Sequence, residues 1–213
     1  GNKTNGKDAV QSNSNQLHQH IDAIRNELKE TNVIIDVAEA DAPTTESWSS
    51  SSVFDWNGKD PDLSVDFANL GVSPEYGKTI GWEIVNGRDF SRDFPSDSAA
   101  FIINEAAARY MTLKEVVGET IRWYDQPYRV VGVVKDIVTR SPFEPVRPTL
   151  YYINRGQGNF ALFRINPDQT AQQALGHLER LYKKYNPDQP FNFRFIDEAY
   201  AQKFGNAERI GKL

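Results

Sequence analysis

Histidine is the side chain in this sequence most suited to metal binding or general base catalysis, and the chain has three. His18 and His20 lie two residues apart on a predicted helix and therefore on different faces of it, so they cannot share a metal ion. His177 lies on a second predicted helix and has no acidic residue four positions away. This spacing favours solvated histidines over a metal site or a catalytic base.

Nucleophilic chemistry finds no support in the motifs. A serine nucleophile is typically held in a G-x-S-x-G turn, and this motif does not occur. Neither a P-loop nor a G-x-G-x-x-G string follows a predicted strand. Cysteine is absent from the chain, which excludes disulfides, thiol catalysis and cysteine-bound metals together. We predict no catalytic residue, no metal and no cofactor.

Carboxylates are the most abundant reactive groups, and paired acids could hydrolyse glycosides or bind calcium. The candidates fall in different predicted elements, where acids at turns and helix starts are commonplace. A hydrolase that uses these acids therefore stays an alternative, not the favoured interpretation. The candidates are Asp60, Asp62, Asp89, Asp93, Asp97, Glu105, Asp136, Asp197 and Glu198.

The densest polar stretch, residues 85–111, is explained by architecture. Asn86 and Gly87 predict a tight turn, and Arg88 is expected to pair with Asp89, Asp93 or a backbone carbonyl. Asp97 and Ser98 interrupt the chain before an apolar strand. Asn104 then caps a helix whose first turn carries Glu105, a favourable position in the field of the helix dipole.

Composition restricts the function further. The chain has 213 residues, of which 39% are hydrophobic and 25% charged, as in folded globular proteins. Its formal net charge of -5 argues against nucleic acid as a partner, because phosphate binding requires a basic surface. No apolar run approaches the roughly 20 residues that a membrane-spanning helix requires.

Hydrophobic periodicity predicts helices and strands in both outer parts of the chain. Residues 14–30 predict an amphipathic helix, and residues 32–40 a β-branched strand. Residues 52–56 and 63–70 predict two strands joined as a hairpin through the Asn57-Gly58 turn. Towards the C-terminus, the predicted elements are strands at 149–154, 160–166 and 190–197, a helix over 167–187 and a further helix from 198.

The middle of the chain predicts shorter elements. Ser73 is the expected N-cap of a short helix. A buried strand at 99–104 passes directly into a helix at 105–111, and residues 119–137 predict two antiparallel strands around a turn at 125–127. The fold class is thus α+β. Residues 14–70 and 148–197 are expected to fold together, residues 71–147 to form an inserted subdomain, residues 1–13 to be a disordered lead-in or tag remnant, and residues 198–213 to begin a helix.

One ordered set of short motifs resembles a known family. Residues 81–111, followed by "VVGETI", "YRVVGVVKDI" and "RPTLYYIN", are similar to the MacB-like periplasmic core domain of bacterial ABC-transporter permeases of the MacB, FtsX and LolC type. The residues that match the family string are Gly87, Arg88, Phe90, Asn104, Glu105, Gly118, Ile121, Gly132, Val133 and Asp136. The resemblance covers about residues 14–213.

The resemblance implies both a fold and a role. The fold would be a porter-like α/β subdomain built from both chain ends, with a small inserted α/β (Sabre-like) subdomain. The intact protein would carry one membrane helix before Asn2 and three after Leu213, and the domain would lie in the periplasm as part of an inner-membrane protein. Its partners would be a cytoplasmic ATP-binding subunit, a second permease subunit and an unknown periplasmic substrate or protein. It would be non-catalytic and would relay the ATP-driven motion of the membrane helices.

A second alternative is an envelope module that binds a ligand or protein without energy coupling. Exposed aromatic residues would then be the anchors, and Trp48, Trp56 and Trp123 are the candidates. The relay hypothesis makes a geometric prediction instead: the chain near Leu17 and the chain near Phe204 should lie close together on one side of the domain.

Overall fold

The computed structural model describes residues 6–43, 49–137, 145–154 and 158–193, with side chains described from residue 18 onward. Two compact units divide the chain. The end unit consists of residues 1–37 and 163–213, and the central unit of residues 38–162. Strands β1 (Ile34–Ala40) and β10 (Phe160–Ile165) both run across this division. Among the described residues, no helix combines the length and the apolar character needed to cross a membrane.

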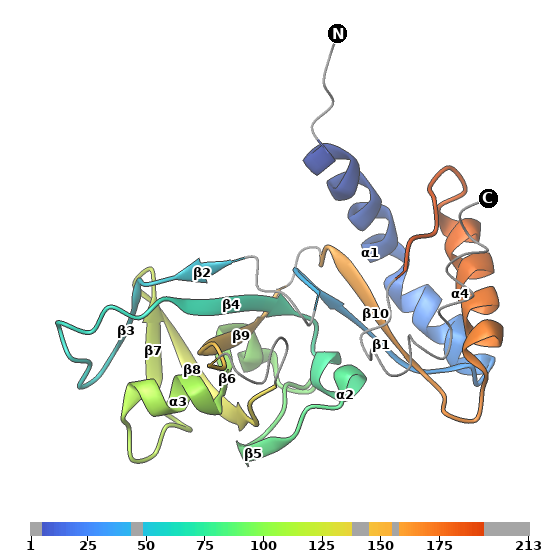
Figure 1. The fold of residues 1–213 in the computed structure, drawn as a ribbon. Helices are drawn as coiled ribbons and strands as arrows, with labels where there is room; N and C mark the ends of the chain where they lie inside the picture. The colour runs from blue at the N-terminus through green and yellow to red at the C-terminus, as the bar shows by residue number, and fades with distance from the viewer. Residues whose placement is uncertain (1–5, 44–48, 138–144, 155–157, 194–213) are drawn as a thin grey trace, which may run out of the picture. The chain divides into compact units, whose positions relative to one another are not determined.

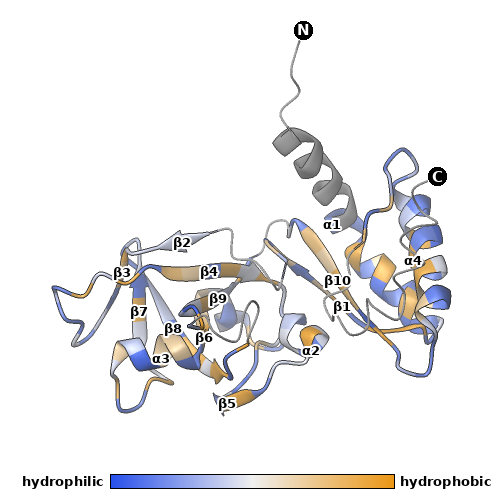
Figure 2. Cartoon of the chain, in the orientation of Figure 1, coloured by the Kyte–Doolittle hydropathy of each residue, from blue (hydrophilic) through white to orange (hydrophobic). Residues whose placement is uncertain are grey.

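The end unit is built around two helices, α1 (Gly6–Glu30) and α4 (Ala171–Tyr185), which pack against each other (Figure 1). The buried positions of α1 recur every three or four residues, at Ile21, Ile24 and Leu28. Helix α4 begins at a capping box in which Thr170 and Gln173 exchange hydrogen bonds. The apolar residues of α4 form a stripe along one side of the helix, and polar residues lie on its other side (Figure 2).

The central unit is a sheet whose neighbouring strands run in the order β4-β9-β6-β8-β7-β3. Strand β2 pairs with β4, and β5 pairs with β8. The pairs β4–β9 and β6–β8 are parallel, whereas β6–β9, β7–β8 and β3–β7 are antiparallel. The bounds of these strands are Ser50–Ser51 (β2), Phe54–Trp56 (β3), Phe67–Val72 (β4), Ile84–Gly87 (β5), Ala100–Asn104 (β6), Thr120–Trp123 (β7), Gln126–Val134 (β8) and Thr149–Ile153 (β9).

Both faces of this sheet are covered. Alternate residues of β6 point in opposite directions, so Ile102 packs into one apolar cluster while Phe101 and Ile103 pack into the other. Helix α2 (Tyr76–Ile80) contributes Tyr76 to the first cluster. Helix α3 (Glu105–Met111) contributes Ala107 and Met111 to the second. The short 3-10 helix η1 (Pro95–Ala99) leads into β6.

The N-terminal helix starts earlier than the sequence predicts. Residues 6–13 belong to α1, although the sequence suggested a disordered lead-in up to residue 13. The residues that follow Gly6 include Lys7, Asp8 and Ala9, and no proline or glycine interrupts them, so nothing in the chain stops the helix from extending towards its N-terminus.

The division into units also differs from the expected one. Residues 38–70 and 148–162, assigned from the sequence to the porter-like subdomain, belong to the central unit together with residues 71–147. The reason is the pairing of β9, which lies between β4 and β6 and joins these segments into one sheet. A unit that contains both chain ends is present, but it is smaller than predicted.

Several local predictions hold, two are wrong and one turn is displaced by a residue. The strand at 100–104, the helix at 105–111 and the cap by Asn104 are confirmed. The predicted hairpin at Asn57-Gly58 is wrong, because β3 pairs with β7 and not with β4. The turn between β7 and β8 lies at Tyr124 and Asp125, one residue earlier than expected, and both residues have positive φ. Helix α2 begins at Tyr76 without a side-chain cap, so Ser73 is not its N-cap.

Candidate functional site

The residues that match the family motifs, called here the family-string residues, all lie in the central unit, and most of them lie around the end of β5 and the start of α3. At the end of β5, Gly87 lies opposite Gly132 of β8 in the strand register. A methyl group on Gly132 would lie 2.2 Å from the backbone oxygen of Arg88, and one on Gly87 would lie 2.3 Å from the oxygen of Val131. Gly87 also has a φ of +74°, which favours glycine. The two glycines therefore allow a backbone approach that no larger residue permits.

The chain leaves this close approach through an ion pair. Arg88 donates two hydrogen bonds to Asp97, at 2.9 and 2.6 Å, and a third of 3.0 Å to the carbonyl of Asp89. Asp97 is 3% exposed and also accepts the backbone N–H of Ser91. The carboxylate raises the pKa of Arg88 through these hydrogen bonds. The carbonyl of Asp89 was among the expected partners of Arg88, but the expected carboxylates of Asp89 and Asp93 were not the ones found.

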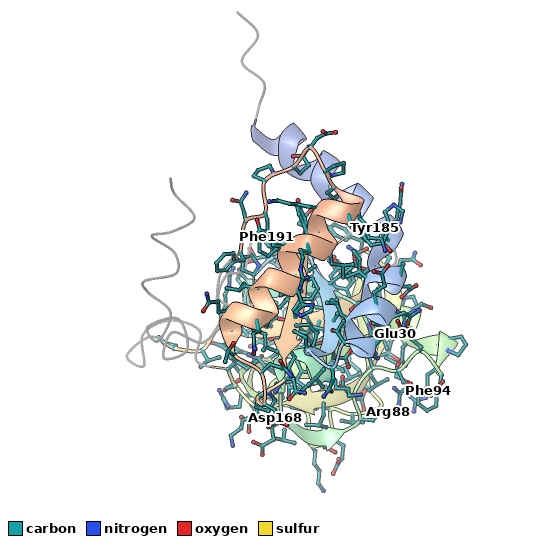
Figure 3. All side chains as sticks on the ribbon, turned by 90° about the vertical axis from the view of Figure 1, so that its right-hand side faces the viewer. Glu30, Arg88, Phe94, Asp168, Tyr185 and Phe191 are labelled. Atoms are coloured by element: carbon teal, nitrogen blue, oxygen red, sulfur yellow. The ribbon has the colours of Figure 1, made fainter. Side chains whose placement is uncertain are left out.

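Phe94 completes this corner. The guanidinium of Arg88 lies 4.1 Å from the centre of the Phe94 ring, and Figure 3 shows the two side chains beside each other. Phe94 remains 46% exposed. Phe90, the third residue of the family string here, is buried in the apolar cluster that also holds Tyr76 and Ile102. Two residues within three positions of Gly87 thus hold the chain here: Phe90 through apolar packing and Arg88 through its ion pair.

A second group of family-string residues ties α3 to its neighbouring strands. The side-chain oxygen of Asn104 accepts from the backbone N–H groups of Ala107 and Thr149, at 3.0 and 2.9 Å. Its amide nitrogen donates to the carbonyl of Arg147 at 2.9 Å. One buried side chain therefore caps a helix and fixes the start of β9.

Glu105 and Asp136 form the reciprocal tie between α3 and the end of β8. Glu105 accepts the backbone N–H of Asp136 at 3.1 Å, and Asp136 accepts that of Ala106 at 2.9 Å. Asp136 also accepts a 2.7 Å hydrogen bond from Arg109. Both acids are engaged with backbone donors, as expected of scaffolding and unlike a pair held ready for hydrolysis.

The remaining family-string residues, Gly118, Ile121 and Val133, each have a local structural role. Gly118 has a φ of +96° and donates its backbone N–H to Val130 at 2.8 Å, which fixes the turn before β7. Ile121 and Val133 belong to the second apolar cluster. Among the described residues, no group of three or more histidine, aspartate or glutamate side chains is placed to hold a metal ion.

The tryptophans proposed as anchors do not form an exposed set. Trp56 is only 5% exposed and packs against Phe67, which corrects its assignment as a surface anchor. Its position in β3 explains this burial, since β3 pairs with β7 over the second apolar cluster. Trp123 is half-buried and contacts Phe54 and Tyr152. Trp48 lies outside the described residues, as does Phe204, so the predicted closeness of the chain at Leu17 and Phe204 stays a prediction.

Sequence reasoning missed one polar group, which surrounds Asp41 at the end of β1. Asn154 and Tyr152, both at the end of β9, donate to the two carboxylate oxygens of Asp41 at 2.7 and 3.4 Å. Burial raises the pKa of Asp41, in spite of these hydrogen bonds. Burial and then Asp41 raise the pKa of Tyr152 to about 12, so this phenol stays a donor near neutral pH. Asp41 is separated from Tyr152 and Asn154 by over a hundred positions, and no local pattern joins them.

The comparisons with known proteins agree with this geometry. The family model described as the MacB-like periplasmic core domain matches residues 4–181. No curated protein matches the chain in sequence.

Two solved structures share the fold. The periplasmic region of MacB from Actinobacillus actinomycetemcomitans is 18% identical, with a TM-score of 0.62, and the match covers 86% of this chain and 82% of that one. The extracellular domain of the noncanonic ABC-type transporter YknZ from Gram-positive bacteria is 17% identical, with a TM-score of 0.55, over 77% of this chain and 82% of that one. Because the family model spans most of the sequence, the chain belongs to the family of MacB-like periplasmic core domains.

Proposed function

We propose that this domain relays motion from the membrane part of an ABC-transporter permease to a substrate or protein partner outside the membrane. Homologous domains are periplasmic or extracellular parts of such transporters, which supports the location. ATP hydrolysis would take place on a separate cytoplasmic ATP-binding subunit. The motion would reach the domain through membrane helices, and a second permease subunit would carry an identical domain.

The observation that carries this proposal is the pairing of α1 with α4 in the end unit. Glu27 of α1 accepts hydrogen bonds from Lys184, at 2.7 Å, and from the hydroxyl of Tyr185. The ring of Tyr185 also stacks on His20, with ring centres 4.8 Å apart. These residues are separated by more than 150 positions. A pull on the N-terminal helix would therefore also move a helix from the C-terminal part of the chain.

A relay further requires a body that does not absorb the motion. Two features of the central unit support such rigidity: a sheet that is covered on both faces, and side-chain hydrogen bonds that hold the backbone around the family-string residues. Asn104, Glu105 and Asp136 each bond to backbone groups of another element. Because Glu105 and Asp136 are committed to backbone donors, the scattered-acid hydrolase loses two of its candidates. The buried Trp56 likewise weakens the case for a simple binding module.

The experiment is a distance measurement in the intact transporter, reconstituted with its ATP-binding subunit. The chain has no cysteine, so single cysteines at Gln172 in α4 and at Lys114, both exposed, can be spin-labelled without background from this domain. Pulsed electron paramagnetic resonance would then measure the distance from each spin label to the same label in the second permease subunit. We expect the distributions to shift between the nucleotide-free and the vanadate-trapped state.

An ATP-binding subunit with an inactivated catalytic site provides the control, and its complex should show no shift. Unchanged distributions at both positions, in a complex that still hydrolyses ATP, would overturn the relay. Absence of any label-to-copy distance would contradict the second permease subunit instead.

A further inference from the structure

The Asp41 group lies where both polypeptide connections enter the central unit. The chain crosses from the end unit between residues 37 and 38, and it returns between residues 162 and 163. Asp41 follows the first crossing within four residues, and Asn159 precedes the second by a similar distance. The contacts of this group among the described residues all lie inside the central unit.

Four chain segments meet at Asp41. Its backbone N–H donates to the carbonyl of Gly71 at the end of β4, at 3.0 Å. Its backbone carbonyl accepts the side-chain amide of Asn159 at 2.9 Å. Its carboxylate accepts from Asn154 and Tyr152 at the end of β9. The backbone and the side chain of one residue thus connect both crossings to the ends of two central strands.

Glycine makes this convergence possible at two points. A methyl group on Gly71 would lie 2.1 Å from a carboxylate oxygen of Asp41. A methyl group on Gly158 would lie 2.7 Å from the β-carbon of Glu39 and 2.8 Å from the backbone nitrogen of Ala40. The segment before β10 therefore packs directly on the segment that follows the first crossing. Glu39 and Ser73 add two hydrogen bonds beside it, at 2.9 and 3.0 Å.

No charged partner of the Asp41 carboxylate is found among the described residues. Among the described residues, each hydrogen-bond partner of Asp41 is neutral, namely a phenol, two amides and one peptide carbonyl. Keeping a partly buried acid in neutral surroundings is costly, because burial disfavours its charged form. An asparagine at position 41 would avoid this cost of burying a charge. The aspartate is therefore a candidate for a specific mechanical or conformational role.

We propose that the Asp41 clasp, formed by Asp41, Gly71, Tyr152, Asn154 and Asn159, joins the two crossings into a single node, so that neither crossing loosens without the other. The proposal concerns the central unit by itself and holds whether or not the relay function is correct. If the relay is correct, motion enters the central unit at one point instead of two.

Two substitutions cut different arms of the clasp. Asp41→Ala removes the carboxylate arm towards β9 but leaves both backbone bonds of residue 41. Asn159→Ala removes the arm from the second crossing and leaves the carboxylate intact. Amide hydrogen exchange of the isolated domain, followed by mass spectrometry, would be read in two windows, residues 38–42 and residues 159–163.

A single node predicts that each variant lowers protection in both windows, by about 10- to 100-fold for the loss of one or two partly buried hydrogen bonds. Independent crossings would give a different result. Asp41→Ala would then affect residues 38–42 alone and Asn159→Ala residues 159–163 alone, and this outcome would overturn the proposal.

Controls separate the clasp from a general loss of stability. Asp66→Ala removes an exposed acid of the same unit, paired with Arg147 at 2.9 Å, and should change neither window. If Asp41→Ala fails to fold, Tyr152→Phe combined with Asn154→Ala removes the same arm from the β9 side. Unchanged protection in both windows for Asn159→Ala in a folded protein would equally contradict the node. The distance measurement on the intact transporter tests the relay separately, so the two proposals can fail independently.

Discussion

Two regions of the central unit hold a carboxylate away from solvent, and they do so in different ways. At the corner after β5, Asp97 receives two hydrogen bonds from the guanidinium of Arg88. At the end of β1, the partners of the Asp41 carboxylate among the described residues are neutral: the Asn154 amide, the Tyr152 phenol and the backbone of Gly71. The corner compensates charge with charge, whereas the described part of the clasp surrounds its carboxylate with neutral dipoles.

The difference indicates what each region tolerates. A bidentate arginine–carboxylate pair fixes both distance and orientation, so the corner is locked at any pH at which the acid is ionised. Neutral donors hold the clasp more weakly, and burial raises the pKa of its acid. We therefore expect the corner to behave as permanent scaffold and the clasp as the adjustable part of the unit.

The largest expected effect distinguishes the two regions through their glycines. In Gly132→Ala, the new methyl group meets the backbone oxygen of Arg88 at 2.2 Å, and backbone cannot move aside. In Gly71→Ala, it meets a carboxylate oxygen of Asp41 at 2.1 Å, which can rotate away, and the β-carbon of Asn154 at 2.9 Å, which needs only a small shift. We expect unfolding free energies lower by about 3 kcal/mol or more for Gly132→Ala, and by about 1–2 kcal/mol for Gly71→Ala. Urea unfolding followed by circular dichroism measures both.

A matched control uses a third glycine. Gly176 lies inside α4 with nothing within 4 Å of the position of an added methyl group. Gly176→Ala should stabilise the domain by about 0.5–1 kcal/mol, because alanine is the better helix former. Equal losses for Gly132→Ala and Gly71→Ala would refute the contrast between rigid corner and adjustable clasp.

The next effect tests charge compensation at the corner. Asp97→Asn keeps the shape of the side chain but leaves Arg88 without its ionic partner and turns one acceptor into a donor. We expect a loss of about 2–3 kcal/mol, below that for a fully buried pair because the Arg88 side chain is 37% exposed. Thermal unfolding of wild type and variant at neutral pH provides the measurement. A variant as stable as wild type would show that the pair is not needed for the corner.

A third prediction uses pH to examine the clasp. Burial raises the pKa of Asp41 in the folded state above its ordinary value of 3.8, so the folded state binds the proton more tightly than the unfolded state. The stability from this group is fully present below the unfolded pKa and is lost as pH rises through the folded pKa. Asp41→Asn cannot titrate. We therefore expect wild type to lose stability relative to Asp41→Asn as pH rises above 3.8.

Urea midpoints of both proteins, measured at several pH values on either side of 3.8, give the difference directly. Burial also raises the pKa of Asp89, but this residue is present in both proteins and its effect cancels. A difference between the two proteins that does not change with pH would mean that Asp41 titrates alike in both states, which contradicts the neutral-clasp interpretation.

The contrast between the two regions also explains what could be predicted from the sequence. The corner is local: Gly87, Arg88, Asp97 and Asn104 lie within eighteen residues, and turn and capping rules apply at that range. The cap by Asn104 followed from those rules. The partner of Arg88 could not be predicted from these rules, because three acids lie near it in the sequence. The path of the 3-10 helix that begins at Pro95 brings Asp97 to it.

The clasp and the strand pairing are non-local, and hydrophobic periodicity carries no signal for either of them. The pairing of β1 with β4 places Asp41 beside Gly71, and the parallel pairing of β4 with β9, across some eighty residues, adds Asn154. The same pairing moved residues 38–70 and 148–162 into the central unit. The expected Asn57-Gly58 hairpin failed for a related reason, since β3 finds its partner in β7 and not in its neighbour along the chain.

The smallest predicted effects compare two arginines that both bind aspartate. Arg88 binds Asp97 through both nitrogens of its fork and covers the ring of Phe94, whereas Arg109 makes one 2.7 Å contact with Asp136 and is 65% exposed. Lysine keeps the charge but loses the fork and the flat stacking surface. We expect Arg88→Lys to cost about 1 kcal/mol and Arg109→Lys less than about 0.5 kcal/mol.

Salt provides the second measurement for this pair of variants. Solvent-exposed ion pairs are screened by added salt, whereas partly buried hydrogen-bonded pairs are screened much less. The small effect of Arg109→Lys should therefore vanish in high salt, and most of the effect of Arg88→Lys should persist. If both effects vanished together, the corner would be held by exposed charge alone, and its distinction from the clasp would rest on the close approach of Gly87 and Gly132.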